Sequence, residues 1–425
     1  MKSFTKEEKS WIMYDWADSV FATIMIAAVF PQFFVSMAGG EGSQGSLWWA
    51  VGVSTSRFLL GILAPFIGAL IAYKGFKKRV LNITIIGGVI STFSIAFFGT
   101  WPMLLIGYII ANMFFSASNF VYDSYLPDVT TPERMDKVSA WGYGMGYIGG
   151  STIPFLVSIA LILFGSNFGI DAEMAVRISI IITAVWWGIF SFPIILHVHH
   201  KYEKDAVDGK ILKKSIKLTI ETAKKIRKNK GILIFIIAYF FYIDGVGTII
   251  NMAVAYGAEL GLGTEGMIAA LFLTQLVAFP FSILFGKLAK IMNSINLIIS
   301  AICIYLVITI TGFIMGFGLE EYWFDENFAT MLFWIMAFMV GMVQGGIQAI
   351  SRSTYGRLIP KEEAGEYFGF FEIFGRFAAI LGPGIYAVVL SVTARPSFGV
   401  ISVSILFLIG LIILIFGKKH ILISK

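Results

Sequence analysis

The sequence predicts an all-α membrane protein whose twelve transmembrane helices form two pseudo-symmetric six-helix bundles. Three observations lead to this fold class: an apolar composition, twelve long apolar segments, and a weak similarity between the two halves of the chain. Of the 425 residues, 57% are hydrophobic and only 14% are charged, and the mean hydropathy is +0.83. Soluble domains carry charges on about a quarter of their residues. This chain is therefore expected to lie in lipid, where helices or closed barrels satisfy the backbone.

Each apolar segment is long enough to cross a hydrocarbon core about 30 Å thick, which needs roughly 20 helical residues. The segments are continuous rather than alternating, which favours helices over a barrel. The first half of the chain is predicted to cross the membrane at 11–37, 47–72, 81–98, 101–123, 138–164 and 174–197. The second half is predicted to cross it at 231–256, 264–286, 293–316, 327–351, 366–391 and 396–417.

Basic residues set the predicted orientation. All but four of the 32 Lys and Arg residues fall in the termini or in every second connection, and such residues mark the cytoplasmic side. We expect a multi-pass protein of the cell membrane, a bacterial inner membrane first of all, with both termini cytoplasmic. The basic stretch 198–230 separates an N-terminal bundle, 1–197, from a C-terminal bundle, 231–425. We interpret it as a partly helical linker and topology signal rather than a site for lipid headgroups or a partner.

The two halves look like weak copies of each other. Tyr122 in the fourth predicted helix falls over Tyr355 in the tenth, and DSV at 18–20 in the first falls over DGV at 244–246 in the seventh. A repeat of six helices is the ground plan of transporters that bind a substrate between two halves near the membrane midplane.

Four motifs carry a resemblance to a known family: YDWADSVFATIM at 14–25, YDSYLPDV at 122–129, QGGIQAISRSTYGRLIP at 344–360 and FGFFEIFGR at 368–376. With them the chain resembles the major facilitator superfamily over its whole length. Within it, the chain looks like the branch of the autophagy-linked vacuolar amino-acid effluxers of fungi, whose many bacterial members have no assigned substrate. The resemblance implies the major facilitator fold and a secondary transporter or facilitator working by alternating access. It implies a small amphiphilic solute, amino acids first, and leaves proton coupling and uncoupled efflux open.

The segment GALIAYKGFKKR at 68–79 resembles a cytoplasmic signature of the superfamily, in which an acidic residue follows the first glycine by four positions. That position is Ala72 here, and its counterpart in the second half is Lys290. The charge latch that the acidic residue makes in the superfamily is therefore expected to be absent.

Ionisable side chains inside the predicted helices are the main candidates for function, because a charge at membrane depth costs roughly 3 kcal/mol on insertion scales. Arg57 lies near the middle of the second helix and needs an anion: Asp18, Asp244 or a substrate carboxylate. It either holds a substrate carboxylate in its planar fork or forms a structural pair with Asp18. Asp244 lies in the seventh helix, where a partly desolvated carboxyl group can hold a proton or bind an ammonium group. The alternative for Asp244 is a paired structural acid. Asp18 is its repeat mate, so both are candidates for proton coupling.

Further polar residues complete the predicted sites. Uncharged side chains that can hydrogen-bond a small zwitterion are assigned to substrate binding with Arg57, Asp244 and Asp18: Asn119, Tyr122, Asn251, Gln275, Gln344 and Gln348. Asp123, Arg352 and Arg357 lie at cytoplasmic helix ends and are interpreted as gate residues that latch the two halves together. Glu372 and Arg376 lie four residues apart on the eleventh helix and are interpreted as a cytoplasmic gate or as a structural pair.

The sequence offers weaker support for functions other than transport. A membrane enzyme acting on lipid would need a nucleophile–base pair or a metal cluster, and the histidines at 197, 199 and 200 are the sole candidate. GMGYIGG at 144–150 lies inside an apolar helix, so it is not a nucleotide loop. The main alternative is transport of a drug, sugar, peptide or lipid-like solute. We expect no enzymatic activity, cofactor, metal or nucleic acid; the expected partners of the monomer are a small-molecule substrate and the lipid bilayer.

Overall fold

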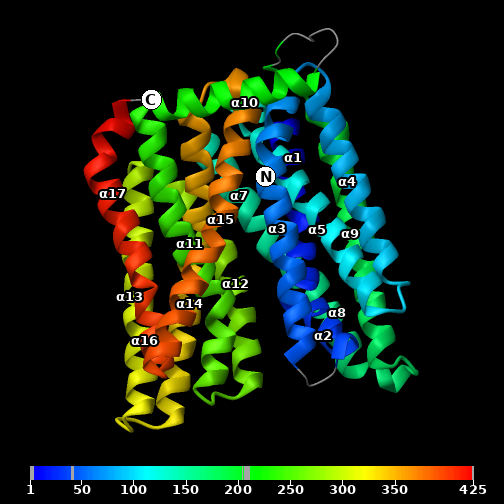
Figure 1. The fold of residues 1–425 in the computed structure, drawn as a ribbon, viewed down its shortest axis with the longest axis vertical. Coiled ribbons are helices and arrows are strands. Elements are labelled where there is room, and N and C mark those ends of the chain that lie inside the picture. The colour runs from blue at the N-terminus through cyan, green and yellow to red at the C-terminus, as the bar shows by residue number, and fades with distance from the viewer. Residues whose placement is uncertain (1–3, 40–42, 203, 205–210, 424–425) are drawn as a thin grey trace. The chain divides into compact units, whose positions relative to one another are not determined.

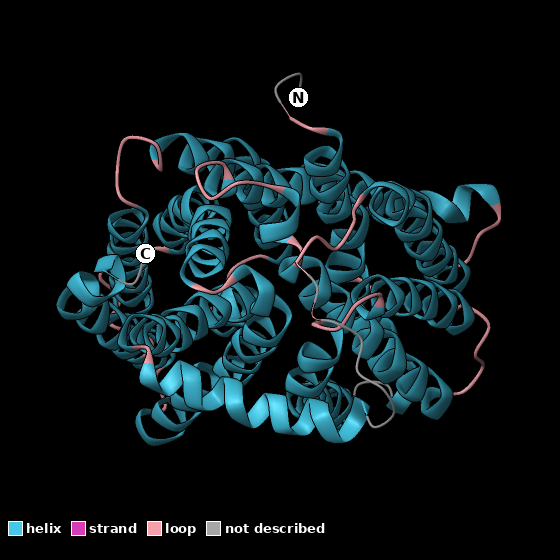
Figure 2. Ribbon diagram, turned by 90° about the horizontal axis from the view of Figure 1, so that it is seen from above, coloured by secondary structure: helices cyan, strands magenta, loops and turns pink. Residues whose placement is uncertain are grey.

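The computed structural model describes residues 4–39, 43–202, 204 and 211–423 (Figure 1). Within helices, the side chains at 43, 151, 211–213, 264–265, 268 and 376–379 lie outside the described part. The described residues are almost entirely helical and contain no named strand (Figure 2). Backbone groups are thus satisfied within helices, as a lipid environment requires.

The helices follow one another along the chain with short connections. The first half contains α1 (Lys6–Phe21), the π-helix η1 (Ala22–Ala28), α2 (Phe30–Gly39), α3 (Ser43–Ile71), α4 (Phe76–Ile95), α5 (Trp101–Ser124), α6 (Leu126–Val129), α7 (Met135–Met145), the π-helix η2 (Gly146–Thr152), α8 (Ile153–Phe164), the 3-10 helix η3 (Gly165–Phe168) and α9 (Ala172–His197). The rest contains α10 (Ile211–Lys228), α11 (Lys230–Glu259), α12 (Thr264–Leu288), α13 (Ser294–Glu320), α14 (Glu326–Leu358), the 3-10 helix η4 (Lys361–Glu363), α15 (Ala364–Thr393), α16 (Pro396–Ser402) and α17 (Ser404–Ile423).

The described residues form 12 spans that are long and apolar enough to cross a membrane, which confirms the predicted number. Each predicted segment corresponds to one span, although the ends differ by several residues. The first span, predicted at 11–37, covers Lys6–Gly39. The basic stretch contains α10, so it is partly helical as predicted.

Capping side chains explain why helices begin where they do. Thr5 and Glu8 form a reciprocal capping box: Glu8 N donates to Thr5 Oγ1 (3.1 Å) and Thr5 N donates to Glu8 Oε2 (2.9 Å). This box starts α1 five residues before the predicted start of the first span. Asn229 and Asp325 cap α11 and α14 in the same way, by accepting backbone N–H bonds from the first turn.

Contacts divide the chain into two compact units. Unit 1 comprises Met1–Pro132, Met145–Thr222 and Pro360–Ile373, and unit 2 comprises Glu133–Gly144, Ala223–Ile359 and Phe374–Lys425. The start of the fifth span therefore clusters in unit 2, and the start of the eleventh span clusters in unit 1. The domain limits proposed from the sequence, 1–197, 198–230 and 231–425, refer to the repeated halves and stay a prediction.

The two units share one packing pattern. In unit 1, α1 packs on α9, α3 packs on α5, and α4 packs on both α5 and α9. In unit 2, α11 packs on α17, α12 packs on α14, and α13 packs on both α14 and α17 (Figure 1). Counted as spans within each half, the same pairs meet: first with sixth, second with fourth, and third with fourth and sixth. This agreement is what the weak sequence repeat predicted.

Candidate functional site

Asp244 is held inside unit 2 by the backbone of another helix. Its side chain lies on α11 and the residue is fully buried. The backbone N–H of Gly382 in α15 donates to both carboxylate oxygens, at 3.1 Å to Oδ1 and 3.1 Å to Oδ2. Gly382 is followed by Pro383, which has no N–H of its own and disturbs a helix interior. The carboxylate thus takes a backbone donor at the point where proline weakens the helix.

Thr248 lies one turn after Asp244 and completes this contact. Its hydroxyl group donates to the carbonyl oxygen of Asp244 (2.7 Å). A Cβ atom placed on Gly382 would lie 1.8 Å from Thr248 Oγ1 and 3.0 Å from Asp244 Oδ1. Glycine is therefore required at position 382 for α15 to approach α11 this closely.

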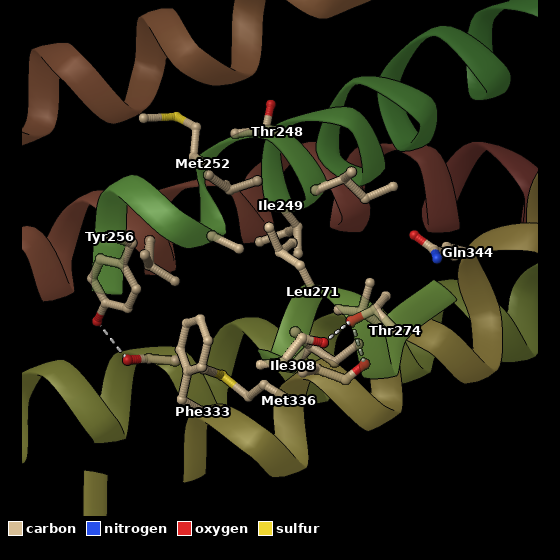
Figure 3. A pocket seen from close by; sticks show the side chains of 18 of the residues that line it. Thr248, Ile249, Met252, Tyr256, Leu271, Thr274, Ile308, Phe333, Met336 and Gln344 are labelled. Atoms are coloured by element: carbon tan, nitrogen blue, oxygen red, sulfur yellow. Dashed lines mark hydrogen bonds between the residues drawn. The ribbon is translucent and has the colours of Figure 1, made fainter. Parts of the chain in front are cut away.

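A cavity with an open mouth lies in unit 2, and Thr248 is one of the residues that line it (Figure 3). Side chains of α11, α12, α13 and α14 line most of it. They are Thr248, Ile249, Ile250, Met252, Ala253, Tyr256, Ala270, Leu271, Thr274, Gln275, Ile308, Gly312, Phe333, Met336, Ala337, Val340 and Gln344, joined by Tyr386, Val400 and Val403.

Two of the predicted substrate-binding residues of unit 2 meet at this cavity, because Gln275 and Gln344 both line it. Gln348 lies one turn after Gln344, and its Nε2 donates to the carbonyl oxygen of Gln344 (3.0 Å). Asn251 is exposed and is not among the lining residues.

The other predicted substrate-binding residues belong to unit 1. Asp18 on α1 is buried, whereas Arg57 on α3 and Asn119 on α5 are half-buried. Tyr122 is fully buried, and its hydroxyl group donates to Asp15 Oδ2 (2.6 Å). Its hydroxyl group is thereby engaged within unit 1, and its role in substrate binding stays a prediction.

Two of the predicted gate residues join α14 to α7 within unit 2. Arg357 Nη1 lies 2.8 Å from Asp136 Oδ2. Arg352 is buried; its Nε donates to Ser139 Oγ (2.9 Å) and its guanidinium group lies 4.4 Å from the ring centre of Tyr143. Asp123 and Glu372 are half-buried in unit 1, and the side chain of Arg376 lies outside the described residues.

A lysine of the linker, Lys204, hydrogen-bonds to the backbone at Ala72, the position where the superfamily signature has an acidic residue. Lys204 N donates to the carbonyl oxygen of Ala72 (3.0 Å), and Lys74 N donates to that of Lys204 (2.9 Å). These bonds bring the ammonium group of Lys204 to Glu366, to which the hydroxyl group of Thr222 also donates. All these residues lie in unit 1.

Carboxylates surround this lysine. Burial, with the nearby carboxylates of Glu366 and Glu221, raises the pKa of the phenol of Tyr73. Glu363 adds a further carboxylate 3.8 Å from the ammonium group of Lys204. The local field is therefore negative and favours a cation at this place.

Sequence reasoning missed several of these charged residues. Asp136, Lys204 and Glu366 lie near the ends of spans, where charges were interpreted as topology signals. Lys77 and Asp128 form another such pair, with Nζ 2.6 Å from Oδ2 and both side chains buried. The available signal was an excess of acids and bases at the same predicted helix ends, but it does not say which of them pair.

The histidine cluster makes ordinary local contacts. His197 Nδ1 lies 3.3 Å from Ser10 Oγ, within hydrogen-bond reach. The ring of His200 meets the edge of Tyr125, with 6.2 Å between ring centres.

Comparison with solved structures shows a shared fold. The human organic anion transporter MFSD10 (TETRAN) superposes with a TM-score of 0.71 at 13% identity, over 96% of this chain and 99% of that one. An outward-facing bacterial homologue of the iron transporter ferroportin gives 0.69 at 13% identity, over 98% and 100% of the two chains. These similarities show the fold of MFS transporters.

Comparison of sequences reaches closer relatives. The family described as "Vacuole effluxer Atg22 like" matches residues 35–135 and 130–420. An uncharacterized MFS-type transporter of Bacillus subtilis, YxiO, is 42% identical over 99% of this chain and 96% of its own length. Autophagy-related protein 22 of Botryotinia fuckeliana is 25% identical over 67% of this chain, which spans about half the length of that relative. The chain therefore belongs to the Atg22-like vacuole effluxer family, within the MFS-type transporters.

Proposed function

We propose that the protein is a secondary transporter that moves a small amphiphilic solute, amino acids first of all, across a membrane by alternating access. Its family, its 12 candidate spans and the packing pattern common to its two units support this proposal. The basic connections support a cell-membrane location with both termini cytoplasmic.

One observation carries the proposal: a fully buried carboxylate, Asp244, held by the backbone of α15 beside Pro383. A charged side chain inside a span is costly to insert, so such residues commonly mark substrate or ion pathways. The carboxylate of Asp244 can attract the ammonium group of an amino acid, or take up a proton that drives transport.

The remaining site residues enter the proposal with Asp244. Arg57 provides a planar fork for a substrate carboxylate, and Asp18 provides a second carboxylate for proton coupling. Polar contacts to the solute are assigned to Asn119, Tyr122, Asn251, Gln275, Gln344 and Gln348. Gating is assigned to Asp123, Arg352, Arg357, Glu372 and Arg376.

A counterflow experiment tests the proposed solute class. The full-length protein is reconstituted in liposomes loaded with one unlabelled solute from a panel of amino acids, dipeptides, sugars and nucleosides, and entry of the same labelled solute is followed. We expect amino acids to accelerate exchange above protein-free liposomes. Exchange of another class alone would remove amino acids as the solute, and exchange of none would contradict transport of the panel classes.

A further inference from the structure

The cavity of unit 2 is shaped for a molecule without charge. None of the described side chains that line it is acidic or basic. An ion placed there would lose its hydration without gaining a counter-charge, which is far more costly than burying an apolar group. Met252 and Met336 contribute flexible walls that adapt to irregular apolar shapes.

Most polar side chains of the cavity wall already have partners. Four hydroxyl groups donate within unit 2: Thr248 to the carbonyl oxygen of Asp244 (2.7 Å), Thr274 to that of Ala270 (2.9 Å), Tyr256 to that of Gly312 (2.7 Å), and Tyr386 to Glu259 Oε2 (2.5 Å). The bonds of Tyr256 and Thr274 appear as dashed lines in Figure 3. These four hydroxyl groups hold the cavity wall together, so few of their hydrogen-bond donors are available to a ligand.

Two side-chain amide atoms of the cavity wall have no hydrogen-bond partner among the described residues. Gln344 is only 2% exposed, and its Nε2 has no hydrogen-bond partner among the described residues. Gln275 Oε1, on the neighbouring α12, is buried and also has none within that part of the chain. Figure 3 shows the carboxamide of Gln344 turned from α14 toward the other lining side chains. The wall therefore offers one unused donor and one unused acceptor in apolar surroundings, where unmade hydrogen bonds are unfavourable.

We propose that this cavity binds an uncharged organic molecule that carries an amide-type pair of acceptor and donor on an apolar body. The carbonyl oxygen of the ligand accepts from Gln344 Nε2, and its N–H donates to Gln275 Oε1. The apolar body packs on Met252, Phe333 and Met336. This binding requires no charge on the ligand, so Gln275 and Gln344 would serve this ligand instead of the zwitterion. The proposal does not rest on amino-acid transport.

Three derivatives of leucine test the assignment by equilibrium binding to the purified full-length protein in lipid nanodiscs. N-acetyl-leucinamide is neutral, N-acetyl-leucine is an anion, and leucine is a zwitterion, while all three share one side chain. We expect saturable binding of the neutral amide and at least about tenfold weaker binding at this cavity of the two charged forms. Absence of binding by the neutral amide, or competition at the cavity by the charged forms with equal affinity, overturns the proposal.

Two variants locate the binding. Gln344→Leu removes the donor and should weaken binding of N-acetyl-leucinamide about fivefold, within the range of one neutral hydrogen bond. It should not lower the melting temperature, because it also removes an unpaired buried amide. Ala337→Leu fills part of the cavity and should abolish binding, whereas Gln32→Leu, at an exposed position of α2, should leave binding unchanged. Unchanged affinity in folded Gln344→Leu and Ala337→Leu would place the ligand elsewhere and refute the site.

Discussion

A single hydrogen atom at Gly382 lets the backbone of α15 reach the carboxylate of Asp244. Any side chain at 382 would meet Thr248 first, with Cβ 1.8 Å from its hydroxyl oxygen. Gly384, on the other side of Pro383, has no such neighbour, because nothing lies within 4 Å of a Cβ built there. Of the two glycines that flank this proline, Gly384 has room for a side chain and Gly382 does not.

This difference predicts the outcome of a matched pair of substitutions. Gly382→Ala should destabilise the protein by about 1–3 kcal/mol through overpacking, whereas Gly384→Ala should change stability by less than about 0.5 kcal/mol. Thermal unfolding of both purified variants in the same detergent checks this. Equal melting temperatures for the two variants would contradict the close approach of α15 to α11.

Single residues show what the sequence could and could not predict. Asp244 and Asp18 were predicted to lie inside the protein because charges within apolar segments cannot face lipid, and both are buried. The sequence could not show that Tyr122 donates to Asp15, since the two are 107 residues apart and many hydroxyl groups were available. It also could not show that the carboxylate of Asp244 accepts from a backbone N–H, because such a contact leaves no side-chain pattern.

Between elements, α7 and α14 are joined by charge inside unit 2. Asp136 meets Arg357 and also accepts from Ser353 Oγ (2.5 Å) and, more weakly, from Ser294 Oγ (3.3 Å). The side chains of the ion pair are only 10% and 14% exposed, so water screens it little. The exposed pair Lys217–Glu221 on α10, 80% and 49% exposed, provides a contrast.

Removing one partner of the buried pair should be costly. Asp136→Ala leaves Arg357 without its carboxylate and should destabilise the protein by about 3 kcal/mol. Glu221→Ala removes a solvated partner and should cost less than about 1 kcal/mol. Thermal melts of both variants measure these two losses of stability. A loss in Asp136→Ala no larger than in Glu221→Ala would show that the α7–α14 contact contributes little to stability.

The linker lysine gives a second comparison between elements. Lys204→Ala deprives Glu366, which is 1% exposed, of its ammonium partner and should destabilise unit 1 by about 1–3 kcal/mol. Lys201 pairs with Glu7 at the surface, 45% and 30% exposed, so Lys201→Ala should cost less than about 1 kcal/mol. Limited proteolysis and thermal melts of the two variants measure this. Equal losses of stability in the two variants would mean that the pair of Lys204 with Glu366 contributes little to the stability of unit 1.

At the scale of elements, hydropathy predicted the spans but not their interruptions. All 12 spans follow from apolar length, which each segment carries by itself. The π-helices η1 and η2 were not predicted, because a hydropathy pattern does not distinguish a π-helix from an α-helix. At η2, a Cβ on Gly149 would lie 1.8 Å from the ring of Trp16 in α1, so the two helices meet backbone to ring. Such contacts depend on the partner helix and cannot be inferred from a local window.

For the molecule as a whole, the weak repeat in the sequence correctly indicated two similar sets of helix contacts. The same pairs of spans pack together in each unit. The sequence did not indicate that Glu133–Gly144 clusters in unit 2 and Pro360–Ile373 in unit 1. That exchange rests on contacts such as Arg357 with Asp136 and Lys204 with Glu366, whose partners a hydropathy profile cannot assign.

Transport through a site at Asp244 is tested most directly by Asp244→Asn in proteoliposomes. The substitution keeps the shape and an oxygen acceptor for Gly382 N–H but removes the charge, and Glu326→Gln at an exposed position serves as the control. Both counterflow of a labelled amino acid and its accumulation under a pH gradient are measured, with melting temperatures to confirm folding. We predict at least a tenfold loss of counterflow, accumulation or both in Asp244→Asn alone. Wild-type rates of both in the folded Asp244→Asn variant would contradict a transport role for this carboxylate.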